Sequence, residues 1–166
     1  ASPIAVQGIA GLPASIGSLI LSQQGSRDQV EVTASFPNPS EADALFNQWG
    51  WSGSSYEIFV APNGAAGADG VHEVDIGVHQ LRGAAEAEEA LQYFMVARGS
   101  LLGLWQTAVE SPGSMSRALI GPGGDGSFEA SVYAMVGSQD IRVTALSWND
   151  YPLSYASGIM RQIAGG

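Results

Sequence analysis

The sequence predicts an α+β fold, an antiparallel sheet of about seven strands with three helices packed against it. Short apolar or alternating runs predict the strands, and three longer segments have helical spacing. The helices are separated by runs of strands, so the strand–helix–strand alternation of a parallel sheet is absent. The 166 residues suit one domain. We expect residues 1–28 to form an N-terminal arm or edge hairpin, and residues 29–166 a single domain.

The first two strands are expected to form a hairpin. Ser18–Ser22 is a short apolar run, and Gln23–Ser26 provides polar and glycine residues for a turn. Gln29–Phe36 then alternates, with Val30, Val32, Ala34 and Phe36 on one side. This period of two is typical of a half-buried strand.

A helix is predicted to follow. Asn38 can cap its first turn, Pro39 suits the first helical position, and Glu41 stands where a capping box places an acid. Gly50 is expected to end it. The buried face recurs at helical spacing and comprises Ala42, Leu45, Phe46 and Trp49.

Two strands should come next, Tyr56–Ala61 and Val71–Leu81. In the second, alternation predicts one core row that begins at His72 and continues through Val74, Ile76 and Val78. The opposite face carries Glu73, Asp75, Gly77 and His79.

The second half begins with the longest predicted helix, Ala84–Leu102. A closing helix is expected after Asn149 or Asp150, with an apolar stripe that includes Leu153 and Met160. Between the two helices we expect a turn at Gly137–Asp140 and four strands, Trp105–Glu110, Ser116–Ile120, Phe128–Val136 and Ile141–Trp148.

Composition excludes several classes of function. The chain has sixteen acidic residues against six basic ones, all arginine, and a net charge of −10. That balance argues against nucleic-acid binding and against electrostatic docking to anionic lipid. The absence of cysteine excludes disulfides, thiol nucleophiles and iron–sulfur clusters.

The N-terminal segment suggests export. Ala1-Ser2-Pro3 resembles the start of a mature chain after a signal peptide has been removed, so we expect an extracellular or cell-envelope location. Glycine, proline and glutamine interrupt the uncharged stretch 1–26, so no membrane-spanning helix is expected. The segment either packs on its own domain or forms an assembly arm through Pro3, Ile4, Val6 and Ile9.

Catalytic and metal sites are poorly supported. Glu73, Asp75 and His79 share a strand face at spacings that suit a metal, but an ordinary solvated face has the same pattern. His72 and His79 are seven residues apart and should lie on opposite faces, so at most one could join a nucleophilic site. We therefore expect no cofactor and no enzymatic activity, with a small carboxylate- or metal-dependent hydrolase as the unfavoured alternative.

Aromatic residues provide the remaining candidate surface. Trp49 fits the buried face of its helix, whereas Trp51 and Trp148 stand at element ends, with Tyr151 and Tyr155 nearby in sequence. Tryptophan and tyrosine are favoured in binding sites because they combine a large rigid area with a polar tip. We expect a ligand or partner surface at Trp51, Trp148, Tyr151 and Tyr155, against the alternative of ordinary edge packing.

The order of elements resembles a known family. The segments Leu45–Trp51, Ala84–Arg98 and Arg142–Ile163 carry a likeness to the PsbP/Mog1-like fold and to small secreted bacterial domains that share it. The resemblance implies a mostly non-enzymatic accessory, assembly or sensor domain. It transfers no functional residue.

The leading hypothesis is thus a non-catalytic exported bacterial domain that binds a protein partner or a small apolar ligand. The alternative is a structural subunit that self-assembles into a filament or surface layer through the uncharged N-terminal arm.

Overall fold

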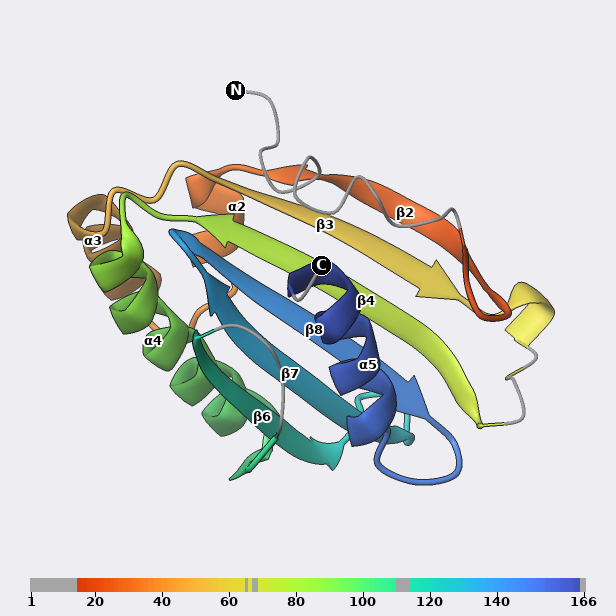
Figure 1. Cartoon of the computed structure of the whole chain (residues 1–166). Helices are drawn as coiled ribbons and strands as arrows, with labels where there is room; N and C mark the ends of the chain where they lie inside the picture. The colour runs from red at the N-terminus through yellow and green to blue at the C-terminus, as the bar shows by residue number, and fades with distance from the viewer. Residues whose placement is uncertain (1–14, 65, 67–68, 110–113, 165–166) are drawn as a thin grey trace.

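A single antiparallel sheet organises the computed structural model, which describes residues 15–64, 66, 69–109 and 114–164. Its strands lie in the order β1-β2-β3-β4-β8-β7-β6-β5 (Figure 1). The α+β class is confirmed, with one short strand and one short helix more than expected. The strands are β1 (Ser15–Ile16), β2 (Leu19–Arg27), β3 (Gly53–Val60), β4 (Val71–Gln80), β5 (Trp105–Thr107), β6 (Ser114–Pro122), β7 (Phe128–Val136) and β8 (Gln139–Ser147).

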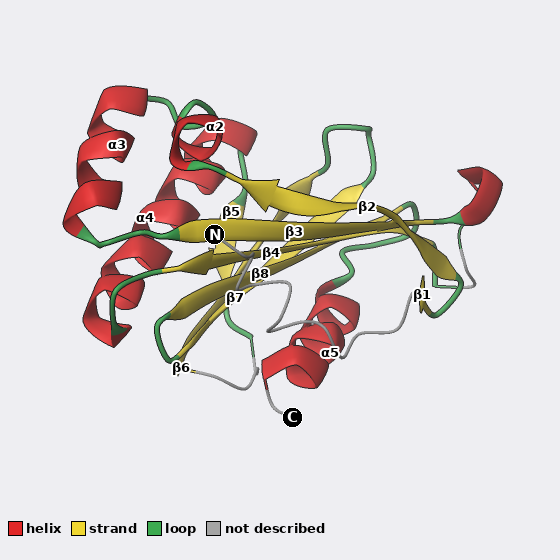
Figure 2. Cartoon of the chain, turned by 90° about the horizontal axis from the view of Figure 1, so that it is seen from above, coloured by secondary structure: helices red, strands yellow, loops and turns green. Residues whose placement is uncertain are grey.

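Helices cover both faces of this sheet (Figure 2). Helices α2 (Gln29–Thr33), α3 (Pro39–Gln48) and α4 (Ala84–Leu102) lie on one side, and α5 (Leu153–Ala164) lies on the other. Each side has its own apolar cluster. Phe59 and Val74 of the sheet and Met160 of α5 are fully buried in one cluster. Phe46 of α3 and Leu91 of α4 are buried in the other. None of the described helices is long and apolar enough to span a membrane.

The predicted strand Gln29–Phe36 is wrong, because its first residues form α2. The Asp28 side chain accepts from the backbone N–H of Glu31 at 2.9 Å, and the Glu31 carboxylate accepts from the N–H of Asp28 at 3.3 Å. This reciprocal capping box satisfies two N–H groups of the first turn. Val32 is buried while Val30 is 74% exposed, so the valines do not share one strand face.

The predicted hairpin is corrected at the same point. Residues 23–26 do not turn but continue β2, which pairs with β3 from Ile20 to Arg27. The hairpin partner of β2 is instead the two-residue β1, at the edge of the sheet. The expected arm residues Pro3, Ile4, Val6 and Ile9 lie outside the described residues.

The later elements follow the sequence closely. Asn38 caps α3 by accepting from the N–H of Glu41, and Gly50 follows the helix with a left-handed φ of 60°. Helix α4 has the predicted bounds and ends at Gly103, whose φ is 70°. Strand β7 also has the predicted bounds, and Val136 pairs directly with Gln139 around a two-residue turn.

A β-bulge at the start of β4 overturns one row assignment. The register with β8 shifts between Val71 and Glu73. Val71 and Val74 therefore both reach the cluster beneath α5, although they are three residues apart. His72 leaves the row of Val74, Ile76 and Val78, so the prediction that it begins that row is wrong. A bulge inserts one residue and breaks the period of two on which the prediction depended.

Candidate functional site

A pocket of about 510 Å³ lies between the sheet face opposite α5 and the two helices α2 and α4. Its floor is formed by residues of β3, β4, β7 and β8, and its walls by α2, α4 and the end of β2. This volume lies within the range of small-molecule sites, roughly 300–1,000 Å³.

One cross-strand row crosses the floor, and in its first four positions glycine alternates with a large residue. Gly25 of β2 pairs with Tyr56 of β3, which pairs with Gly77 of β4. Gly77 in turn pairs with Arg142 of β8, and Arg142 pairs with Tyr133 of β7. A Cβ atom at Gly25 would lie 3.2 Å from the Tyr56 hydroxyl oxygen, and one at Gly77 would lie 3.6 Å from Nη2 of Arg142. Because the two glycines have no side chains, the neighbouring Tyr56 and Arg142 side chains can lie over them and the cavity remains open.

Arg142 is the central charge of the pocket. Burial and then the nearby Arg98 cation lower the pKa of its guanidinium, although Tyr133, Asp75 and Glu129 act in the opposite direction. It makes no ion pair with any residue in the described part of the chain. A buried cation is costly without a counter-ion, so Arg142 is a group that an anionic ligand would stabilise.

The other two arginines of the pocket already have partners. Arg98 of α4 donates to the Glu129 carboxylate at 2.9 and 3.2 Å, and Glu129 is almost fully buried. Arg27, at the end of β2, lies over the ring of Tyr56 at 4.3 Å from its centroid. This distance is within the range of a cation–π contact.

His79 adds a neutral donor to the same cavity. Its Nδ1 accepts from the indole N–H of Trp51 at 3.0 Å. Because that nitrogen accepts, the ring proton is on Nε2, for which the described residues provide no hydrogen-bond partner. Burial, followed by the charges of Arg142 and Arg27, lowers the pKa of His79 to about 3. His79 is therefore uncharged at neutral pH.

Asp140 of β8 is a buried acid at the pocket. It is the cross-strand neighbour of His79 and only 2% exposed. Neither carboxyl oxygen has a hydrogen-bond partner among the described residues. Burial raises the pKa of Asp140 to about 8, so the carboxyl group is protonated at neutral pH.

The pocket walls toward the two helices are apolar. Phe36, which follows α2, stacks on Tyr93 of α4 with ring centroids 5.3 Å apart and also contacts Phe94. Further along α4, Leu101 and Leu102 are 60% and 40% exposed. The cavity therefore combines a cationic floor with an apolar wall that is open to solvent at the end of α4.

The predicted metal candidates do not converge. Glu73 and Asp75 lie close together, where burial and then the Asp75 carboxyl raise the pKa of Glu73. His79, four residues from Asp75, directs its ring toward Trp51 and the pocket. No group of three His, Asp or Glu residues within the described ranges could hold a metal ion.

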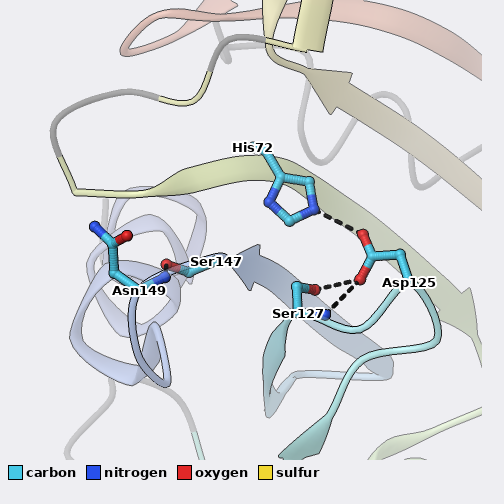
Figure 3. Close-up of polar contacts among 5 residues, drawn as sticks. All are labelled: His72, Asp125, Ser127, Ser147 and Asn149. Atoms are coloured by element: carbon cyan, nitrogen blue, oxygen red, sulfur yellow. Dashed lines mark hydrogen bonds and ion pairs between the residues drawn. The ribbon is translucent and has the colours of Figure 1, made fainter.

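His72, Asp125 and Ser127 form a second polar cluster, at the opposite end of β4 (Figure 3). The Asp125 carboxylate bonds the His72 ring at 2.8 Å and accepts from both the hydroxyl and the N–H of Ser127. Burial raises the pKa of Asp125, but these hydrogen bonds outweigh it and hold the value at about 2. The serine donates to the aspartate rather than to the histidine, so this arrangement is not that of a catalytic triad.

The predicted aromatic surface is divided by the structure. Trp51 is half-buried behind His79 and contacts Phe46, whereas Trp148 is 49% exposed and stacks on His72 at 4.1 Å. The two histidines are seven residues apart on β4, which corresponds to roughly 23 Å.

The two predicted tyrosines pack elsewhere. Tyr151 packs against Trp105 and Phe128, and Tyr155 of α5 packs against the apolar cluster on its side of the sheet. Of the four predicted aromatic residues, only Trp51 approaches the pocket, through His79.

Sequence reasoning missed the arginines of the pocket. Three of the six basic residues of the chain, Arg27, Arg98 and Arg142, line this one cavity. A glycine within a predicted strand, Gly77, was a usable signal, because such a glycine marks a close approach or a bound group. The partners of Gly77 depend on the register between strands, which the sequence pattern does not reveal.

Comparison with known proteins gives one similar structure. Neither the protein-family models nor the curated proteins include a match. The extracellular domain of PknH from Mycobacterium tuberculosis shares the fold, with a TM-score of 0.56 and 12% sequence identity. The alignment covers 100% of this chain and 92% of that domain.

Proposed function

We propose that this chain is a non-catalytic exported domain that binds a small organic molecule in the pocket between α2, α4 and the sheet. The observation that carries the proposal is the position of Arg142. The chain leaves this cation without an ion pair on the pocket floor and keeps space beside it with Gly77. A folded domain gains no stability from such an arrangement, whereas a binding site needs it.

The absence of catalysis is part of the proposal. His79 is the imidazole of the pocket, and its Nδ1 is engaged by Trp51. With a pKa of about 3, it is a poor general base at neutral pH, because efficient bases have pKa values near the working pH. The fold shared with the extracellular domain of PknH supports the exported location.

Filling the pocket tests the proposal. In Gly77→Val, a branched side chain would project toward Arg142 and occupy the cavity. Gly53→Val is the matched control, because Gly53 is also a strand glycine and has no atom within 4 Å of an added Cβ. Nile red, a neutral dye whose fluorescence rises in apolar sites, provides the probe.

We expect wild type and Gly53→Val to bind one dye molecule per chain, and Gly77→Val to lose binding at least tenfold. Urea unfolding of each variant would show that both fold, because valine is favoured in strands. Equal binding by all three proteins, or no saturable binding by wild type, would refute the pocket as the binding site.

A further inference from the structure

The charge of the pocket is opposite in sign to the net charge of the chain. The net charge is −10, yet the pocket is lined by three arginines against two acids, Glu31 and Asp140. The carboxyl of Asp140 is held in its neutral form by burial. The pocket is therefore positive inside a strongly negative protein, and a cationic ligand would meet like charge there.

The balance of partners indicates how many negative charges a ligand should carry. Arg98 is neutralised by Glu129, and Arg27 lies over Tyr56 on the side of the pocket where Glu31 is located. Arg27 and Arg142 both lack an ion pair with a described residue, but Arg27 has its ring contact with Tyr56 whereas Arg142 has no such contact. One cation with neither a counter-ion nor a ring partner calls for one anionic group. The planar fork of a guanidinium matches a carboxylate, which can accept two parallel hydrogen bonds from it.

The surrounding groups favour the same head group. The proton on Nε2 of His79 is a neutral donor in the same cavity, which His79 and Arg142 line from the paired strands β4 and β8. Above them, the wall formed by Phe36, Leu101 and Leu102 is apolar and partly exposed. A ligand that satisfies both regions has a carboxylate at one end and an apolar body at the other.

We infer that the ligand of this pocket is an amphipathic monocarboxylate, whose carboxylate binds Arg142 and whose apolar body lies along α2 and α4. This inference rests on the proposed function, since it names the chemical class that the same pocket would take.

The test uses three ligands with the same twelve-carbon chain and different head groups. Dodecanoate is anionic, dodecanol is neutral and dodecyltrimethylammonium is cationic. Each is titrated below its aggregation concentration into the full chain, with intrinsic tryptophan fluorescence and displacement of Nile red as readouts. The variant Arg142→Met removes the charge and keeps the length of the side chain. Arg117→Met makes the same change in net charge at the next position of the cross-strand row, outside the pocket.

We expect dodecanoate to bind at least about tenfold more tightly than dodecanol, since hydrogen bonds to charged groups are worth this much. The cationic ligand should bind more weakly than either. Arg142→Met should abolish the preference for dodecanoate over dodecanol, while Arg117→Met should behave as wild type.

The outcomes separate the two proposals. Equal affinity for dodecanoate and dodecanol, both lost in Gly77→Val, would overturn the carboxylate and leave the binding pocket intact. A preference for dodecanoate that persists in Arg142→Met would also overturn it. Failure of all three ligands to bind, together with failure of Nile red, would overturn the proposed function itself.

Discussion

Replacing the buried Asp140 by asparagine should stabilise the protein, and the size of the effect should depend on pH. In the folded protein burial raises the pKa of Asp140 from 3.8 to about 8. Between these values the unfolded chain has released the proton while the folded chain still holds it. The free energy of unfolding therefore falls as the pH rises from about 4 to about 8. Below about pH 4 this contribution to stability is fully present. Asparagine does not titrate in this range and removes the effect.

The magnitude follows from the width of this window. Each unit between the two pKa values corresponds to about 1.4 kcal/mol. At pH 7 the solution is about three pH units above the ordinary pKa of 3.8 that Asp140 has in the unfolded chain. Asp140→Asn should therefore gain about 4 kcal/mol in free energy of unfolding. This is a large part of the 5–15 kcal/mol that is typical of a domain. The amide is isosteric with the carboxyl group, and both are left without hydrogen-bond partners, so that cost cancels in the comparison.

Urea unfolding at pH 4, 5, 6, 7 and 8, followed by tryptophan fluorescence, would measure this difference. The gap between Asp140→Asn and wild type should grow by about 1.4 kcal/mol per pH unit from pH 4 to pH 8. Asp43→Asn is the control, because it makes the same acid-to-amide replacement at an exposed acid on α3. A constant gap across this range, or an Asp140→Asn protein less stable than wild type at pH 7, would refute the reasoning.

Four further changes test the fold around the pocket by the same unfolding measurement. Asp28→Ala removes the capping box of α2 and should cost about 1 kcal/mol; no loss would mean that the cap is not formed in solution. Val30→Asp should change stability by less than about 0.5 kcal/mol, whereas Val32→Asp should cost more than about 2 kcal/mol. Equal costs would favour a strand there. Phe46→Ala, at a fully buried ring, should cost about 3–5 kcal/mol, and a cost below 1 kcal/mol would contradict its burial. Trp51→Phe loses the donor to His79 and should cost about 1 kcal/mol, so an unchanged midpoint would argue against that hydrogen bond.

The long helices could be predicted because their signals extend over several turns. Helix α4 repeats its apolar face over 19 residues, and α3 has a cap at Asn38 and a glycine at its end. Helix α2 has only five residues, in which valine alternates by chance with polar residues. The sequence contains the D-x-x-E pattern of its capping box at Asp28, just as it contains N-x-x-E at Asn38. The alternation of valines nevertheless favoured a strand at this position.

The candidate site could not be predicted because it depends on pairing between strands. Arg142, Gly77 and Tyr56 are far apart in the sequence and become neighbours only through the register of β3, β4 and β8. The bulge at His72 shows the same dependence, since one inserted residue changed the row that alternation predicts. The likeness to PsbP/Mog1-like domains stays a prediction.

The gathering of three arginines at the pocket of a strongly acidic chain also has a consequence for kinetics. An anion that approaches from solvent meets the repulsion of a chain with sixteen acids before it reaches Arg142. Association should therefore be slow in dilute buffer. Salt shortens the range of this repulsion to about 10 Å at 0.1 M, but it screens a partly buried pair much less. The association rate for a carboxylate ligand should then rise with ionic strength while its dissociation rate hardly changes, the opposite of the usual behaviour of a protein that attracts its ligand from a distance.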